Sequence, residues 1–154
     1  MDLFPTLTIT AQPDNAFLAE HELVPDPEKK LLVVYESDLP FLQRVLTAAG
    51  YKDPNADLHL LRREASDPDL DLATLVRGLG VGQVILFGQE LNSLGLHFVI
   101  ARYAPVEIAG TRYMVCPGVG EVAGAKKRGD KRPSLDLWRG LQAGFLKTSD
   151  QAEG

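Results

Sequence analysis

The sequence predicts an α/β fold of three layers, α/β/α, around a mainly parallel central sheet. Short, largely apolar runs at 31–35, 58–61 and 83–87 are typical of strands that are buried on both faces. Segments whose apolar residues recur at helical spacing separate these runs, and such alternation favours parallel strands joined by right-handed crossovers. A length of 154 residues suits one domain with a core of its own.

The first strand is expected at Leu31–Tyr35, and a helix follows it. Ser37 or Asp38 can cap this helix, because a short side-chain oxygen accepts a hydrogen bond from a first-turn N–H. Pro40 fits the first turn, where its missing N–H costs nothing, and Gly50 ends the helix. The residues expected to face the core recur at helical spacing: Phe41, Leu42, Val45, Leu46 and Ala49.

A second strand at 58–61 leads to a helix that Asp69 or Asp71 caps and that the glycines of 78–82 end. Glycines that hold a phosphate must follow a strand and open a helix, so this cluster predicts a helix stop rather than a nucleotide site. A third strand at Gln83–Phe87 and a short helix at 89–94 come next. The apolar face of the second long helix consists of Leu72, Leu75, Val76 and Leu79.

The pattern of the chain changes after this third unit. A strand at 98–100 is expected, then a hairpin at Val106–Cys116 that turns at Ala109 and Gly110. The last helix begins near Pro133. Its inward face is expected to hold Leu135, Trp138, Leu141 and Phe145.

Residues 1–30 differ from the rest because four prolines stand among scattered apolar and acidic residues. These prolines exclude a long helix and a central strand. We expect an extended or partly ordered arm that either packs on its own domain or orders on a partner. The predicted organisation is therefore an N-terminal arm at 1–30, an α/β domain at 31–147 and a disordered tail at 148–154.

Composition limits the classes of function. The net charge of −5 gives no general attraction to nucleic acid, although a local basic segment can still contact phosphate. No apolar run approaches the roughly 20 residues that span a bilayer and no charged-then-apolar leader opens the chain, which favours a cytoplasmic protein. The one cysteine, Cys116, excludes an intramolecular disulfide and a zinc site with several Cys ligands. We expect neither a cofactor nor a metal.

Three features could carry chemistry. Cys116 is either a nucleophile or a buried, inert thiol, and the second is favoured because no His follows it in the chain. The carboxylates at 67, 69 and 71 fit helix capping better than metal binding. A basic loop before the last helix is either simply solvated or contacts phosphate, and it holds Lys126, Lys127, Arg128, Lys131 and Arg132.

The order of the segments from 31 to 146 resembles the uracil-DNA glycosylase superfamily. The segment 33–40 stands where these enzymes carry a Gly-Glu-x-Pro-Gly type loop, and their third strand also ends in Gly, here Gly88. Cys116–Gly118 stands at their His-Pro-Ser loop, and the segment at Leu137 and Trp138 resembles their closing helix. The resemblance implies the fold of that superfamily.

The departures from the superfamily fall on its reactive positions. Base excision needs a donor that stabilises the departing uracil anion and a polar group that places water. Cys116 is a poor donor in place of the His, and Gly118 replaces the Ser. We therefore expect a vestigial cleft without catalysis, formed by Ser37, Asp38, Pro40, Cys116, Pro117 and Gly118.

The psi subunit of the bacterial DNA polymerase III clamp-loader assembly, which uses this fold without catalysis, is similar to the chain in three places. These are the segment Ser37–Pro40 after an apolar strand, Leu137 with Trp138 near the C-terminus, and a short arm before the domain. The resemblance implies an adaptor whose arm binds the clamp-loader motor subunit and whose body binds a small accessory subunit. By resemblance, the partner-binding residues of the arm are Leu3, Phe4, Leu7 and Ile9.

Three functions follow from these patterns. The first is a psi-like adaptor of DNA replication that acts through protein–protein contacts. The second is an atypical glycosylase-like DNA-processing enzyme that uses Cys116 or Asp38, and the third is an interaction module that shares only the fold. Filled loops at Ser37–Pro40 and Cys116–Gly118 would favour an adaptor, whereas an open pocket with convergent polar groups would favour an enzyme.

Overall fold

A five-stranded mixed sheet forms the centre of the protein, which the computed structural model describes over residues 23–97 and 101–145. The strands run in the order β2-β1-β3-β5-β4. All neighbours pair in parallel except β4, which forms the antiparallel edge next to β5. The strands are β1 (Leu31–Tyr35), β2 (His59–Arg62), β3 (Gln83–Phe87), β4 (Val106–Ile108) and β5 (Thr111–Cys116).

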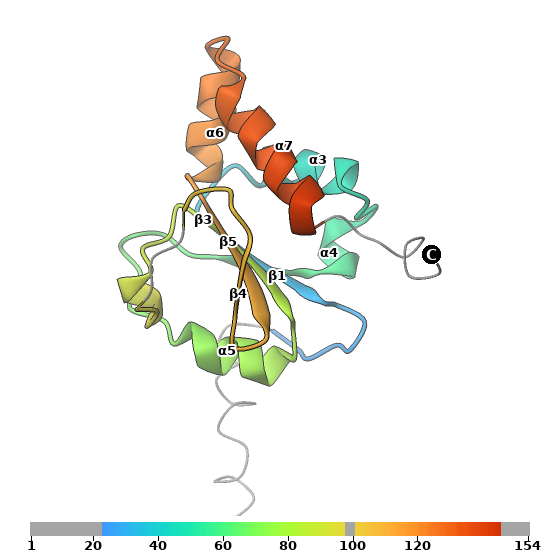
Figure 1. Cartoon of the computed structure of the whole chain (residues 1–154), viewed down its shortest axis with the longest axis vertical. Helices are drawn as coiled ribbons and strands as arrows, with labels where there is room; N and C mark the ends of the chain where they lie inside the picture. Colours follow the sequence, from blue (N-terminus) through green and yellow to red (C-terminus); the bar gives the residue numbers. More distant parts are fainter. Residues whose placement is uncertain (1–22, 98–100, 146–154) are drawn as a thin grey trace, which may run out of the picture.

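Helices cover both faces of this sheet (Figure 1). On one face, α3, α6 and α7 close a core with one set of strand residues, and on the other face α5 closes a second core. The prediction of an α/β fold with a mainly parallel sheet is confirmed. The two layers of helices on the sheet are compatible with the predicted α/β/α arrangement. The helices are α3 (Leu39–Ala48), α4 (Pro54–Asp57), α5 (Leu72–Leu79), the 3-10 turn η1 (Asn92–Leu94), α6 (Val119–Lys127) and α7 (Arg132–Gly144).

Strand β1 is buried on both faces, as its run of apolar residues predicts. Leu31, Val33 and Tyr35 point into the core beneath α3, α6 and α7, while Leu32 and Val34 point into the core above α5. This alternation follows from the two-residue period of a strand. Because β1 lies between β2 and β3, it is an internal strand with hydrogen-bonded neighbours on both sides.

Helix α3 begins and ends where the sequence predicts. Asp38 is the N-cap, with φ of 54°, and its carboxylate accepts a hydrogen bond from the N–H of Phe41 at 3.4 Å. Asp is one of the few residues that adopt this left-handed conformation at modest cost. Gly50, with φ of 107°, follows the helix and permits the turn. Of the predicted inward face, Val45 is only half-buried and the other four residues are buried.

Helix α5 also has the predicted boundaries. Asp71 caps it by accepting hydrogen bonds from the N–H and the hydroxyl of Thr74, at 3.1 and 2.7 Å. Gly80, with φ of 72°, ends it in the left-handed conformation. The glycines of 78–82 therefore form a helix stop, and all four predicted apolar residues of this helix are buried.

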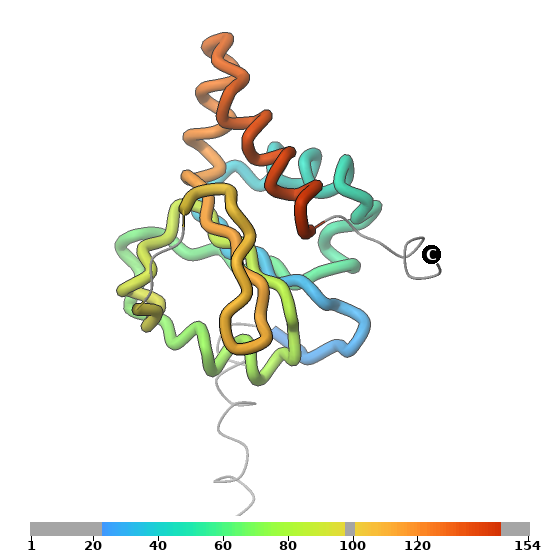
Figure 2. The backbone as a smooth tube through the Cα atoms, in the orientation of Figure 1, coloured from blue at the N-terminus to red at the C-terminus, as the bar shows by residue number. Residues whose placement is uncertain are grey.

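The basic segment before the last helix is not the loop that the sequence predicts. Lys126 and Lys127 form the last turn of α6, and Arg128 is the C-cap of this helix. Helix α7 begins at Arg132, so the two helices form a hairpin that projects from the sheet (Figure 2). The prediction missed α6 because Gly120 and Gly124 lower helix propensity and its apolar residues show little helical periodicity.

The prediction of which residues of α7 face the core was wrong at one position, Leu135. Leu135 is 49% exposed, whereas Leu137 is 2% exposed and packs into the core with Leu141 and Phe145. Gly140 allows this helix to approach the sheet, because a Cβ there would lie 2.5 Å from the sulfur of Met114. Trp138 is half-buried against the same core.

Several sequence predictions fall outside the described residues. These are the arm residues Leu3, Phe4, Leu7 and Ile9, the strand at 98–100 and the tail at 148–154. Within the described end of the arm, Leu23 is buried in the core on the α5 side. Among the described helices, none combines the length and the apolar character that crossing a bilayer requires.

Candidate functional site

The carboxyl ends of β1, β3 and β5 form the place where this fold would hold a ligand. The two strands that follow β1 in the chain, β2 and β3, lie on its opposite sides, so the strand order reverses beside β1. In open parallel sheets a crevice forms at such a reversal, outside the carboxyl ends of the strands. We call this place the crevice; Glu36, Gly88 and Gly118 follow or nearly follow the three strand ends here.

Glu36 occupies the crevice and binds the start of α6. Its carboxylate accepts hydrogen bonds from the N–H of Val119 at 2.8 Å and from the N–H of Gly120 at 3.0 Å. The hydroxyl of Ser37 donates a third hydrogen bond to it at 2.7 Å. A carboxylate in this position satisfies N–H groups that a helix leaves unpaired and interacts favourably with the positive end of the helix dipole.

The pKa of Glu36 is set by two opposing effects. Burial alone raises the pKa, but the hydrogen bonds from Gly120, Ser37 and Val119 together lower it below its ordinary value of 4.5. The side chain is therefore ionised at neutral pH. Since its oxygens already accept three hydrogen bonds, Glu36 acts as an internal cap and takes the place that an external anion would need at this helix terminus.

The backbone around Glu36 closes the crevice further. A Cβ on Gly88 would lie 2.9 Å from the Cα of Gly118, and a Cβ on Gly118 would lie 2.6 Å from a carboxylate oxygen of Glu36. A Cβ on Gly120 would lie 2.8 Å from the hydroxyl oxygen of Ser37. The glycines therefore permit this close approach, since a methyl group on any one of them would lie closer than 3.0 Å to the atom named.

Cys116, Pro117 and Gly118 are buried, so the predicted cleft is not open at this loop. The side chain of Cys116 is 2% exposed and lies in the core with residues of α3, α6 and α7. Burial raises the pKa of its thiol far above the ordinary value, and Arg102 offsets only part of this rise. A thiol in this environment stays protonated and is not a nucleophile.

The other predicted cleft residues divide between two places. Ser37 lies with Glu36 in the crevice. Asp38 and Pro40 instead line a separate groove beside Phe41, together with residues of α6. Ser37 thus shares Glu36 as a neighbour with Gly118. Asp38 and Pro40 line the groove, whereas Cys116 is buried and is not part of that lining.

The basic residues also divide. Lys126 and Lys127 line the groove beside Phe41, whereas Lys131 is exposed at the tip of the α6–α7 hairpin. Arg132 donates two hydrogen bonds to Asp130, at 2.9 and 3.0 Å, and these hold the pKa of Asp130 at about 2. Because Asp130 neutralises Arg132, the five predicted cations do not act as one patch.

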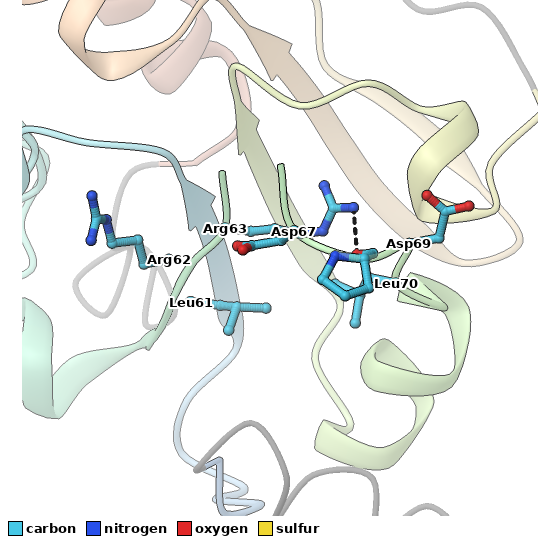
Figure 3. A pocket seen from close by; sticks show the side chains of 7 residues that line it. Leu61, Arg62, Arg63, Asp67, Asp69 and Leu70 are labelled. Carbon is cyan, nitrogen blue, oxygen red and sulfur yellow. Dashed lines mark hydrogen bonds between the residues drawn. The ribbon is translucent and has the colours of Figure 1, made fainter. Parts of the chain in front are cut away.

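Arg63 clamps the loops that follow β2 and β3 beside a cavity of about 250 Å³ (Figure 3). Its guanidinium donates to the carbonyl oxygen of Pro68 at 2.8 Å and to the side-chain oxygen of Gln89 at 3.0 Å. The amide of Gln89 donates in return to the carbonyl oxygen of Arg63 at 2.9 Å. Arg63 is 6% exposed, and these neutral partners compensate part of its burial, while its Nε has no hydrogen-bond partner among the described residues. The network holds loops together, and we assign it a structural role.

No metal site is found among the described residues, which contain no group of three or more His, Cys, Asp or Glu side chains able to hold an ion. Asp71 caps α5, and Asp67 accepts a hydrogen bond from the N–H of Glu64 at 2.8 Å. His59 is buried at 3% exposure, and burial followed by the charge of Lys29 lowers its pKa from 6.5.

Sequence reasoning missed Glu36, Arg63 and Arg44 as important residues. Glu36 had a usable signal, since it is a carboxylate directly after a buried strand, at the position of the glycosylase-type loop. Arg63 had none, because only the fold brings it to Gln89. Arg44 had a local signal, because it stands three residues after Phe41 on the predicted helix and lies over its ring. No model of a known protein family matches the chain, and a search of the curated proteins found no match.

Proposed function

We propose that the protein is a non-catalytic, psi-like adaptor of the bacterial clamp-loader assembly that acts in the cytoplasm through protein–protein contacts. One observation carries the proposal: the crevice, where a glycosylase-type enzyme would hold its substrate, is filled by Glu36 and by the approach of Gly88 to Gly118. Cys116, which stands at the position of the catalytic His, is a buried and protonated thiol.

The resemblance to the psi family supports the choice of partner. Two of its segments have structural roles in this fold: Asp38 caps α3, and Leu137 is buried at 2% exposure in the core. Such residues maintain a scaffold and carry no chemistry of their own. The finer assignment to the uracil-DNA glycosylase fold belongs to the same proposal, and the strand order around the crevice supports it.

Capture of purified clamp-loader subunits by the full chain tests this function. We expect the full chain to bind the motor subunit, and the variant Leu3→Ser/Phe4→Ser/Leu7→Ser/Ile9→Ser to bind it at least about tenfold more weakly, because each lost anchor removes apolar burial. Substitution is preferable to deletion of residues 1–25, which would also remove Leu23 from the core. Absence of capture by the wild-type chain would refute the proposal, whereas unchanged capture by the variant would refute only the arm assignment.

A further inference from the structure

A groove lies between α3 and the α6–α7 hairpin, on the helical face away from α5. Two adjoining cavities of about 320 Å³ each share Phe41, Arg44 and Lys126 in their linings, so they form one continuous depression. One end reaches Asp38 and Pro40, and the other reaches Leu137 and Trp138. None of these residues contributes to the crevice described above.

The floor of the groove is apolar and partly open. Val45 and Trp138 are half-buried and pack on the core, and Phe41 beneath them is 8% exposed. A half-buried aromatic and aliphatic floor gains free energy when a partner covers it, at roughly 25 cal/mol per Å² of apolar surface. The floor therefore suits one large apolar side chain as an anchor.

The rim of the groove is basic. The guanidinium of Arg44 lies 5.7 Å and the ammonium of Lys126 lies 6.0 Å from the centre of the Phe41 ring, and Lys127 lines the same cavity. Within residues 23–97 and 101–145, no carboxylate forms an ion pair with any of these three cations. Asp38 is the acidic member of the lining, so the groove keeps a positive balance in a protein of net charge −5.

We propose that this groove binds an acidic peptide segment of a partner protein, with an apolar side chain on the floor and carboxylates beside Arg44 and Lys126. The inference rests on the proposed function as an adaptor and identifies the body surface that would contact a partner. Charge complementarity supplies the argument, since a segment of this composition neutralises unpaired cations while it covers the apolar floor.

The groove fits a peptide better than a single-stranded nucleic acid. Nucleotide bases stack on exposed aromatic faces, but Phe41 is 8% exposed and has two cations over its ring, and Trp138 is half-buried against the core. The cations of the lining are confined to Arg44, Lys126 and Lys127, and Lys131 lies outside it, so the groove offers no long basic track for a phosphate backbone.

Trp138 provides a direct measurement, because it lines the groove and is the one tryptophan of the chain. The full chain is titrated with a synthetic peptide rich in Asp and Glu that carries one Phe and one Leu. We expect a saturable change in tryptophan fluorescence that weakens as salt is added. A matched peptide with Lys in place of every acidic residue is expected to produce no such change.

Two variants locate the binding. Arg44→Glu/Lys126→Glu reverses two exposed rim charges and is expected to raise the Kd for the acidic peptide at least about tenfold. Lys131→Glu is the matched control: it reverses an exposed charge of the same hairpin outside the groove and should leave the Kd unchanged. Thermal unfolding checks that both variants are folded. If Arg44→Glu/Lys126→Glu is not folded, Arg44→Gln/Lys126→Gln is used in its place.

Each remaining outcome contradicts the proposal. Absence of peptide binding, or equal loss in Lys131→Glu and in the groove variant, would exclude a specific site in the groove. Tighter binding of an oligothymidine strand than of the peptide would assign the groove to nucleic acid. Displacement of the probe by a synthetic peptide of residues 1–22 at lower concentration than by the probe itself would assign it to the chain's own segment. Capture of the clamp-loader motor subunit by a wild-type chain that shows no binding of the acidic peptide would overturn this inference and leave the adaptor function standing.

Discussion

The hydrogen bonds of Glu36 give the clearest quantitative prediction. Glu36→Ala removes the acceptor of two N–H groups at the start of α6 and of the Ser37 hydroxyl. A side-chain cap contributes about 1 kcal/mol, and a negative charge at a partly buried helix N-terminus contributes about 1 kcal/mol more. We therefore expect the free energy of unfolding to fall by about 2 kcal/mol, which for a chain of this size lowers Tm by about 4 to 8 °C.

Glu36→Gln separates the contribution of the negative charge from that of the side chain's shape, because glutamine is uncharged and of nearly the same size. The amide keeps one oxygen acceptor but loses the charge, so the expected loss at pH 7 is about 1 kcal/mol. The pKa of Glu36 is lowered in the folded protein, so its contribution is present above the unfolded value of 4.5 and is lost as the pH falls through the folded pKa. The difference between wild type and Glu36→Gln should consequently disappear in acid.

Urea unfolding followed by circular dichroism measures these losses at pH 7 and at acidic pH. Glu121→Gln is the matched control, because Glu121 stands exposed in the first turn of the same helix and accepts no described hydrogen bond from Val119 or Gly120. We expect it to lose about 0.5 kcal/mol or less. Equal losses for Glu36→Gln and Glu121→Gln would refute the role of Glu36 as the internal cap.

Three further predictions test the crevice and the core. Gly118→Ala should lose about 2 kcal/mol of stability, since its Cβ would lie 2.6 Å from Glu36, whereas Gly82→Ala, with no atom within 4 Å, should be nearly neutral; similar losses by urea unfolding would argue against close packing. Cys116 should react with a thiol reagent ~100-fold more slowly in native protein than in urea, and equal rates would contradict its burial. Burial lowers the pKa of His59, so below pH 6.5 its imidazole binds fewer protons in the folded protein than in the unfolded protein. The free energy of unfolding should therefore decrease as the pH falls, by up to about 1.4 kcal/mol per pH unit. An identical slope in His59→Gln would assign this loss to another group.

The sequence predicted the strands and the two capped helices because their signals are local. The apolar run of Leu31–Tyr35, the cap of Asp38 and the stop at Gly80 each depend on a few neighbouring residues. Helix α6 was missed because Gly120 and Gly124 weaken its local signal, and Gly120 serves a close approach to Ser37, which is distant in the chain. A residue chosen for close approach lowers the local helix signal, so propensity and packing disagree at this point.

The candidate site was likewise predictable where its signals are local and not where distant residues meet. The sequence identified Cys116 and Gly118 as departures from a catalytic loop, but it could not show that Glu36 fills the space beside them. The groove was not predicted: the sequence placed Lys126 in a basic loop, while its position over Phe41 depends on the packing of α3 against α6. Contacts between residues far apart in sequence decided both features.

The central claim is that the crevice is closed to substrate, and base release from a uracil-containing oligonucleotide tests it most directly. We predict that the full chain, in excess over single-stranded or duplex DNA, releases no more uracil than a sample without protein. Release that wild type catalyses and that disappears in Cys116→Ala or Asp38→Asn would contradict the claim.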